Sequence, residues 1–430
     1  MAYRKADVNL IEAMTDEDKR ILQAVYNHRC LNEDLMYEFF YKEKNISRGY
    51  AARRVRWLCS HDLLRPVEYG EDFPALFLTT FGIETYRYIY EIPKEIYDIE
   101  TGRTKPTLRL SKELLMKPNN LRHQIALNRF ALEFDKRANG SFEYVYQDEK
   151  FVNLYTTIRP DGLIAMQNAD VFLEMDMASE RKEALLSKWN HYRSFLKSKE
   201  YREKNKKMVM VFIVNNIKDA ERRRRLVLST MQLGLLDLLD NCFEVYVDTP
   251  QNIMNILFEK ITTGCSKEQE DLQDLTSCLA TQHCFLASPA SFLKEILPET
   301  TFFSYVRKLN KDKKVLVQDG RPQEFLLDVY WGRPMSVLNK ILYYNRMSAE
   351  MMRSMHRRIP YLIVATDERE VYYDLKAIQA VDCPNIFFTT HERLQRSSFP
   401  EAIFQFDSLG NISHFVDFGL QRRAYERSIT

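Results

Sequence analysis

The chain is poor in glycine and in clustered cysteine. Its 430 residues include only 12 Gly, and neither a GxxxxGK[ST] nor a GxGxxG motif occurs. Because these motifs supply the backbone amides that hold nucleotide phosphates, we do not expect a nucleotide-binding loop. The Cys residues number seven and form no CxxC pair. This argues against a disulfide framework and a structural zinc site, and it favours reduced thiols in the cytoplasm.

Long apolar runs and a strong net charge are also missing. No stretch of about 18 uncharged apolar residues occurs, and the N-terminal segment MAYRKADVNL has no signal-peptide core. We therefore expect a soluble cytoplasmic protein without a membrane segment. The formal net charge is +2, so nucleic-acid binding would depend on local basic patches. Apolar residues make up 45% of the chain, which is enough for several globular domains.

Residues 15–90 have the pattern of a winged helix. Thr15 is a candidate N-cap for the first helix, LNEDLMYEFFYK predicts the second, and Ser47 precedes the third, RGYAARRVRWLCSHD. Two short strands around a Gly/Asp/Pro turn predict the wing, and IETYRYIYE predicts a closing helix.

The third helix of this pattern is rich in arginine. Its basic residues are Arg48, Arg53, Arg54 and Arg56. In winged helices that bind DNA, the corresponding helix lies in the major groove, so we expect these side chains to bind DNA. The alternative is a solvated face on a winged helix that binds another protein.

The central segment places carboxylates in strands that otherwise resemble core strands. GLIAM and DVFLEMDMA predict two consecutive strands joined at Gln167 and Asn168, with Asp161 at the start of the first and Glu174 and Asp176 in the second. Residues two apart in a strand face the same side. Grouped carboxylates repel each other unless a cation neutralises them. We therefore predict that Asp161, Glu174 and Asp176 bind Mg²⁺ or Mn²⁺ as a cofactor for phosphodiester cleavage.

A helix predicted from about residue 179 to 196 follows these strands. Glu180, Ala184, Lys188 and Tyr192 are spaced by four and line one face of it. If this face lies toward the carboxylates, Lys188 could stabilise the charge that develops on the phosphate or hold an attacking water.

These residues resemble known families. RPDG…FLEMD…K…Y is similar to the PD-(D/E)xK nuclease core, with Asp161 and Glu174 as its two acids. With the N-terminal winged helix and the LRHQIALN helix, residues 15–216 resemble the replication-relaxation family, which includes the MOBC-type conjugative relaxases. The usual Lys two residues after the second acid is Asp176 here, and the resemblance implies that Lys188 takes its place. It also makes His123 a candidate site residue.

Each candidate also has a structural explanation. Asp161 could be a turn aspartate in PDG, and Glu174 could form an ion pair with Arg159 or Lys188. Asp176 and Glu180 could simply begin the helix, where acids favour its dipole. Lys188 and Tyr192 could be solvated, and His123 could be structural.

The C-terminal part contains a faint repeat of this segment. At an offset of 152, Asp328, Lys340 and Tyr344 correspond to Asp176, Lys188 and Tyr192, whereas Lys313 and Leu326 replace Asp161 and Glu174. The two acids needed for metal binding are thus missing. We interpret residues 263–430 as a degenerate nuclease-like copy kept for DNA grip or for packing, with chance similarity as the alternative.

The expected fold class is α+β and multidomain. We predict a winged helix-turn-helix in residues 1–92, a linker in 93–117, a PD-(D/E)xK-like catalytic domain in 118–262 and the degenerate copy in 263–430. A basic run, ERRRR, is expected to open an amphipathic helix after residue 218.

Three functions fit this pattern. The first is a metal-dependent DNA-nicking relaxase that cuts one strand at an origin of transfer of a plasmid or integrative element. The second is a DNA-binding regulator or replication initiator with an inactive nuclease fold, and the third is a restriction-like or repair endonuclease. Expected partners are double- and single-stranded DNA, with conjugation accessory or coupling proteins as further candidates. The eight His form no HxH pair, so a three-histidine relaxase site is not supported, and the choice between a tyrosine nucleophile and water stays open.

Overall fold

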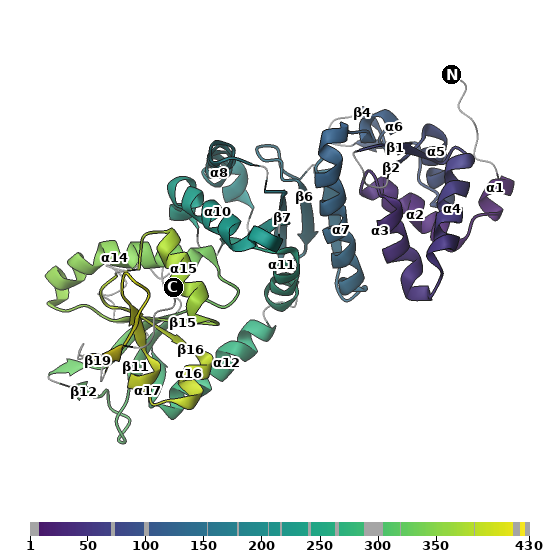
Figure 1. The fold of residues 1–430 in the computed structure, drawn as a ribbon. Helices are drawn as coiled ribbons and strands as arrows, with labels where there is room; N and C mark the ends of the chain where they lie inside the picture. Colours follow the sequence, from purple (N-terminus) through teal and green to yellow (C-terminus); the bar gives the residue numbers. More distant parts are fainter. Residues whose placement is uncertain are drawn as a thin grey trace. The chain divides into compact units, whose positions relative to one another are not determined.

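The structure, a computed structural model, describes residues 8–69, 74–98, 103–152, 154–178, 180–204, 206–215, 217–239, 242–262, 266–287, 304–318, 320–381, 383–415 and 422–425. The chain divides into two compact units, residues 1–167 and 168–430, and both combine helices with strands (Figure 1). This agrees with the α+β class expected from the sequence. Among the described residues, no helix has the length and apolar character needed to cross a bilayer.

The first unit begins with helices and a small hairpin and continues into two further strands. Its elements are α1 (Val8–Glu12), α2 (Asp16–Asn27), α3 (Glu33–Met36), α4 (Arg48–Ser60), β1 (Leu64–Val67), β2 (Ala75–Leu78), α5 (Thr80–Ile89), β3 (Glu95–Asp98), β4 (Arg103–Pro106), α6 (Ser111–Leu114), α7 (Leu121–Ala138), β5 (Tyr144–Asp148) and β6 (Gly162–Met166). Helices α2 to α4, the β1–β2 hairpin and α5 follow the order expected for a winged helix. The hairpin's turn lies outside the described residues.

The caps predicted for this unit are present. The Thr15 hydroxyl accepts a hydrogen bond from the Asp18 amide at 3.2 Å, and the Asp18 carboxylate accepts one from the Thr15 amide at 2.8 Å. This capping box satisfies two amides that the helix itself leaves without partners. Ser47 caps α4 through the Tyr50 amide. The predicted linker, in contrast, contains the β3–β4 hairpin and α6, because residues 95–98 pair with residues 103–106.

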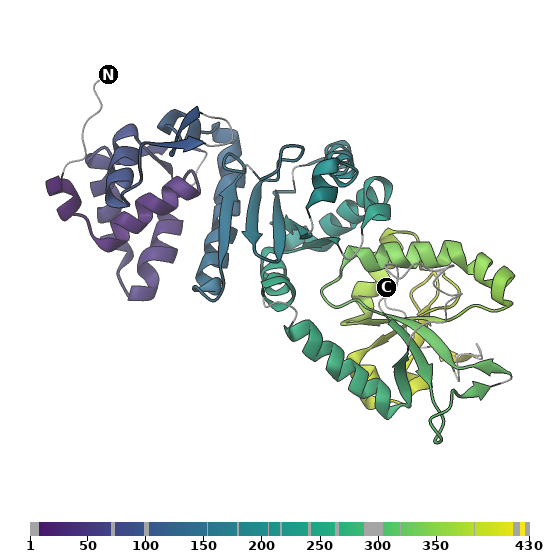
Figure 2. The ribbon, with the colours of Figure 1, turned by 180° about the vertical axis from the view of Figure 1, so that it is seen from behind.

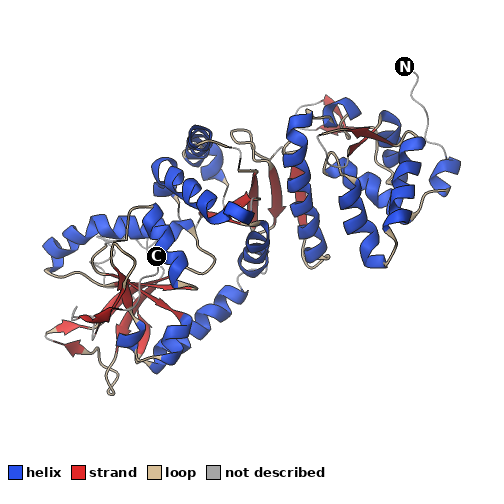
Figure 3. Cartoon of the chain, viewed as in Figure 1, coloured by secondary structure: helices blue, strands red, loops and turns tan. Residues whose placement is uncertain are grey.

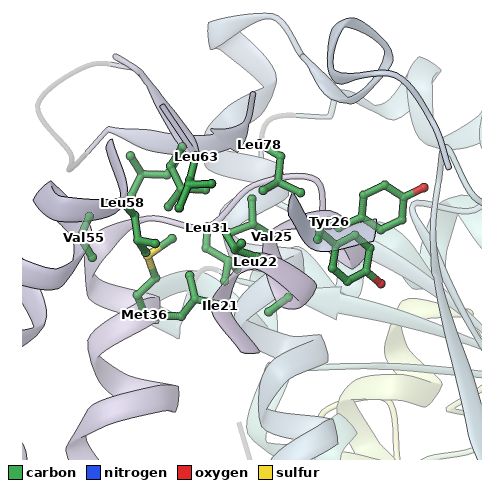
Figure 4. Packing of buried hydrophobic residues seen from close by; sticks show 14 of the residues in the cluster. Ile21, Leu22, Val25, Tyr26, Leu31, Met36, Val55, Leu58, Leu63 and Leu78 are labelled. Atoms are coloured by element: carbon green, nitrogen blue, oxygen red, sulfur yellow. The ribbon is translucent and has the colours of Figure 1, made fainter. Parts of the chain in front are cut away.

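An apolar core holds the first part of this unit together. Ile21, Leu22 and Val25 of α2 are fully buried, as their helical spacing predicts, and they pack with Leu58 of α4 and Leu78 of β2 (Figure 4). Burying side chains of this size contributes about 1.5–3 kcal/mol each. The core therefore fixes α4 with its other face exposed.

The second unit contains two α/β regions. Its elements are β7 (Ala169–Asp176), α8 (Lys182–Leu196), α9 (Lys199–Glu203), β8 (Lys207–Val214), α10 (Ala220–Gly234), β9 (Phe243–Asp248), α11 (Pro250–Ile256), α12 (Ser266–Thr281), β10 (Cys284–Ala287), β11 (Ser304–Lys308), β12 (Val317–Gln318), β13 (Arg321–Pro322), β14 (Glu324–Val329), α14 (Met335–Met355), β15 (Tyr361–Ala365), α15 (Glu368–Ala377), β16 (Ile386–Thr390), α16 (His391–Arg396), α17 (Phe399–Ala402), β17 (Phe404–Phe406), β18 (Ile412–Phe415) and β19 (Arg422–Tyr425). Figure 3 shows helices on both sides of the larger sheet of this unit.

The two large sheets share a run of elements. Strands β5 and β6 pair in the first unit and β7, β8 and β9 are neighbours in the second, whose larger sheet begins β10-β11-β14-β15-β16. The first pair is antiparallel in each sheet, and the last two pairs are parallel. In each, a helix precedes the first strand and a long helix, α8 or α14, joins the first two parallel strands.

The polar residues of the LRHQIALN helix, α7, form a buried network in the first unit. Gln124 donates hydrogen bonds to Asp148 at 2.6 Å and to Asn128 at 2.9 Å, and Asn128 donates to the carbonyl groups of His28 and Cys30. Arg29 lies 3.4 Å from the Asp148 carboxylate. The network ties α7 and β5 to the turn after α2, so these motif residues have a structural role.

This network makes the stability of the protein depend on pH. Burial raises the pKa of Asp148 from 3.8 to about 6, although Arg29 acts in the opposite direction. The folded form binds the proton of the Asp148 carboxyl more tightly than the unfolded form does. The stabilisation that this gives is therefore complete below about pH 4 and is lost as the pH rises through about 6. A shift of this size corresponds to about 3 kcal/mol.

The side chain of the Asp148→Asn variant does not titrate, so its free energy of unfolding should not decrease for this reason as the pH rises. Urea denaturation at several pH values between 4 and 7 measures it. From pH 4 to pH 7, the free energy of unfolding of wild type should fall by about 2–3 kcal/mol relative to that of the variant. A constant difference would show that Asp148 is charged in the folded protein throughout.

Candidate functional site

The centre of the candidate site in the second unit is the side chain of Glu174. This residue lies in β7, whose eight residues are all buried. Its carboxylate accepts hydrogen bonds from the Lys188 ammonium at 2.9 Å and from the Tyr192 hydroxyl at 2.5 Å. Both donors come from α8, one turn apart, as the spacing of four predicts. This face of α8 therefore lies toward Glu174, and Lys188 and Tyr192 are not solvated side chains. The Glu174–Lys188 contact is the ion pair that the structural explanation of Glu174 expected.

Lys188 lies between two carboxylates. Besides Glu174, its ammonium is 3.1 Å from a carboxylate oxygen of Glu180, in the segment between β7 and α8. The other oxygen of Glu180 is buried and accepts no hydrogen bond from any residue within the described ranges. Two carboxylates and one ammonium carry a net charge of −1. The cluster of Glu174, Glu180, Lys188 and Tyr192 is called the Lys188 cluster below.

Asp176 has a different environment from Glu174. Its carboxylate accepts hydrogen bonds from Arg223 of α10 at 2.6 and 2.8 Å and from the Ala178 amide at 3.1 Å. The third Arg223 nitrogen donates to the Glu180 carbonyl at 2.7 Å. Arg223 thus neutralises Asp176 and holds the backbone of Glu180, so it is a positioning residue for the Lys188 cluster.

The donor atoms fit a divalent ion unequally. Glu180 offers a buried oxygen without a hydrogen bond among the described residues, beside the carboxylate of Glu174, and such hard oxygens suit Mg²⁺ or Mn²⁺. Asp176 fits less well than Glu174, because both of its oxygens form a bidentate ion pair with the permanently charged Arg223 guanidinium, whereas Glu174 accepts hydrogen bonds from Lys188 and Tyr192. Within the described ranges, no group of three or more His, Cys, Asp and Glu side chains is arranged to hold a metal.

Arg223 is a site residue that the sequence reasoning missed. It belongs to the ERRRR run, in which Arg223 and Arg224 are buried whereas Arg222 and Arg225 are exposed. A signal was available, because Arg223 precedes the buried Val227 by four residues and therefore lies on the apolar face of α10. A charged run is usually solvated, so the run alone does not indicate that Arg223 is buried.

The remaining predicted acid, Asp161, lies in the first unit. It is part-exposed and lies directly before β6. Its carboxylate is 3.1 Å from a ring nitrogen of His123, which projects from α7. The structure thus pairs two residues that the family resemblance had marked, 38 positions apart in the chain.

The four arginines of α4 differ in their surroundings. Arg54 forms an ion pair with the buried Asp18 and lies over the Trp57 ring, so it is part of the fold. Arg48, Arg53 and Arg56 are exposed, and Arg48 also contacts Asp34. The exposed face of α4 therefore carries three cations, one fewer than the sequence predicted.

Comparison with known proteins supports the resemblance seen in the sequence. Residues 22–211 match the model of the replication-relaxation family. The match includes α4, the LRHQIALN helix and the Lys188 cluster, and it covers less than half of the chain. No curated protein and no solved structure matches the chain.

Arg223 is expected to be essential for the folded state. In Arg223→Met, the buried Asp176 loses its cation, so we expect a loss of about 3–5 kcal/mol in the free energy of unfolding. Arg222→Met, at the exposed neighbour, should change it by less than about 0.5 kcal/mol. Replacing both partners, in Asp176→Leu with Arg223→Met, should cost less than Arg223→Met alone, since no charge is then left unpaired. Urea denaturation of the three variants checks this, and a harmless Arg223→Met would contradict the assignment.

Proposed function

We propose that the chain is a metal-dependent DNA-nicking relaxase whose cleavage site is the Lys188 cluster. The observation that carries the proposal is the position of the Lys188 ammonium between the carboxylates of Glu174 and Glu180, with one Glu180 oxygen left without a hydrogen bond among the described residues. An ammonium next to acidic oxygens is suited to stabilising a phosphate under attack. The match of residues 22–211 to the replication-relaxation family supports a role on DNA.

Each residue has a proposed task. Glu174 and Glu180 would hold Mg²⁺ or Mn²⁺. When bound, the ion would lower the pKa of a coordinated water and stabilise the leaving oxygen. Lys188 would stabilise the charge on the phosphate oxygens. Tyr192 is buried and donates to Glu174, so we assign it the task of orienting that carboxylate. Water is then the proposed nucleophile.

DNA recognition is proposed for residues 15–90, as a winged helix. The support is the order of α2, α3, α4, the β1–β2 hairpin and α5, together with the exposed cations of α4. We propose Arg48, Arg53 and Arg56 as DNA contacts and an origin of transfer as the target.

The C-terminal region is proposed to be a degenerate copy of the nuclease-like fold. There the Lys340 ammonium is 2.8 Å from the Asp328 carboxylate, and both side chains are buried. The lysine of β14–α14 therefore pairs with an acid of the preceding strand, as Lys188 does with Glu174. Here Tyr361 of β15 is the third partner, donating to Asp328 at 3.0 Å. Burial raises the pKa of Asp328, and no second acid contacts Lys340 within the described residues.

A specific observation also favours the second candidate function, a non-cleaving DNA-binding regulator. The pairing of Asp176 with Arg223 removes one of the three acids that the sequence had assigned to the metal. A regulator that does not cleave DNA needs no metal ligand at Asp176. A nuclease, in contrast, needs Glu180 to take the place of Asp176 as a ligand.

A plasmid-nicking assay separates the two functions. With Mg²⁺ or Mn²⁺, purified protein should convert supercoiled plasmid that carries its own origin to the open circle. Glu174→Gln should reduce the rate at least 100-fold, because it removes a negative ligand, and a gel shift should show unchanged DNA binding.

Glu183→Gln is the matched control. It makes the same chemical change on α8, at an exposed position outside the Lys188 cluster, and it should nick like wild type. Cleavage that survives in Glu174→Gln would refute the proposed site. Binding without any nicking by wild type would favour the regulator.

A further inference from the structure

The loop between β11 and β12 is an ordered hairpin. Leu309 and Val315 form a β-bridge, and the Asn310 amide donates to the Lys314 carbonyl at 2.8 Å. The Asn310 side-chain oxygen accepts hydrogen bonds from the amides of Asp312 and Lys314, both at 3.0 Å. Figure 2 shows this loop as a narrow hairpin that reaches beyond the sheet of the second unit. Its tip therefore has a defined shape and is accessible.

The tip of this hairpin carries a concentrated positive charge. Lys311, Lys313 and Lys314 are exposed, and Asp312 is the one acid among residues 310–314. None of the three lysines forms an ion pair with a residue that the structure describes. At the base of the hairpin, in contrast, Arg307 pairs with Glu324. The charge at the tip is thus not used to hold the fold together.

The backbone at Lys313 adopts the left-handed conformation of a tight turn. Lys313 has a φ of 59°, in the left-handed region where Gly and Asn are favoured and most other residues are strained. The turn would be satisfied by glycine at this position. Lys313 therefore stands at the bend of the turn, with its side chain exposed.

We propose that this hairpin, through Lys311, Lys313 and Lys314, is a second DNA-contacting element that binds the phosphate backbone of duplex DNA. This inference rests on the proposed function of the chain on DNA. Phosphates are the partner that closely spaced, unpaired ammonium groups fit, and such contacts position DNA without reading its sequence. The hairpin would add a grip on DNA that is separate from α4.

The salt dependence of DNA binding measures how many phosphate contacts the hairpin makes. Each phosphate contact contributes about 0.9 to the slope of log K against log salt concentration. The triple variant Lys311→Ala, Lys313→Gly and Lys314→Ala should therefore have a slope shallower by about 2–3. Glycine at 313 relieves the backbone strain, so the melting temperature should not fall. Fluorescence anisotropy with a duplex, at several salt concentrations, gives the slope.

A charge-matched control isolates the position of the charges. Lys199→Ala, Arg353→Ala and Lys376→Ala remove the same net charge from exposed sites of the same unit, and the slope should stay close to wild type. An unchanged slope in the hairpin variant, or an equal fall in the control, would overturn the inference. An acidic protein as the real partner would also leave DNA binding unchanged and so would overturn it.

A variant of α4 separates this inference from the proposed function. Arg53→Ala with Arg56→Ala should weaken binding through the proposed winged helix. If the α4 variant loses DNA binding while the hairpin variant keeps the wild-type slope, the chain acts on DNA but the hairpin does not contact it. If the wild-type protein does not bind DNA, both the proposed function and the role of the hairpin are refuted.

Discussion

The neutralisation of buried carboxylates is the constraint on which the second unit depends. A charged carboxylate in a strand such as β7 would destabilise the fold by several kcal/mol without a partner. Glu174 is matched by Lys188 and Tyr192, and Asp176 by Arg223. These contacts decide which face of α8 and of α10 lies against the strand. The positions of Lys188 and Glu180 follow from this pairing, so the chemistry of the site and the packing of the unit have a common origin.

The same constraint recurs in the C-terminal α/β region. Burial raises the pKa of Asp374, but the guanidinium groups of Arg224 and Arg333 outweigh it and hold that pKa below its usual range. Because Arg224 is the neighbour of Arg223 in α10, one helix supplies cations to acids of both α/β regions within the unit. Asp328 and Lys340 are a further pair, but both are enclosed. An enclosed pair has no room for a substrate, whereas Glu180 and Lys188 are part-exposed.

Much of this could be predicted from the sequence, for identifiable reasons. Local periodicity and capping rules predict Thr15 and Ser47 as caps, the strand with Glu174 and the shared helix face of Lys188 and Tyr192. What could not be predicted depends on long-range partners. Arg54 and Arg223 read as solvated cations, yet each reaches an acid 36 or 47 positions away. The sequence therefore predicts Asp176 as a metal ligand, whereas the structure pairs it with Arg223, and Glu180 contacts Lys188. The division into domains stays a prediction.

The most direct test of the central claim is a measurement of metal binding. Titration of the protein with Mn²⁺, followed by the electron paramagnetic resonance signal of the free ion, gives the number of ions bound. The account predicts that wild type binds Mn²⁺ and that Glu174→Gln with Glu180→Gln loses this binding while the fold is retained by circular dichroism. Binding that persists undiminished in the folded double variant would contradict it.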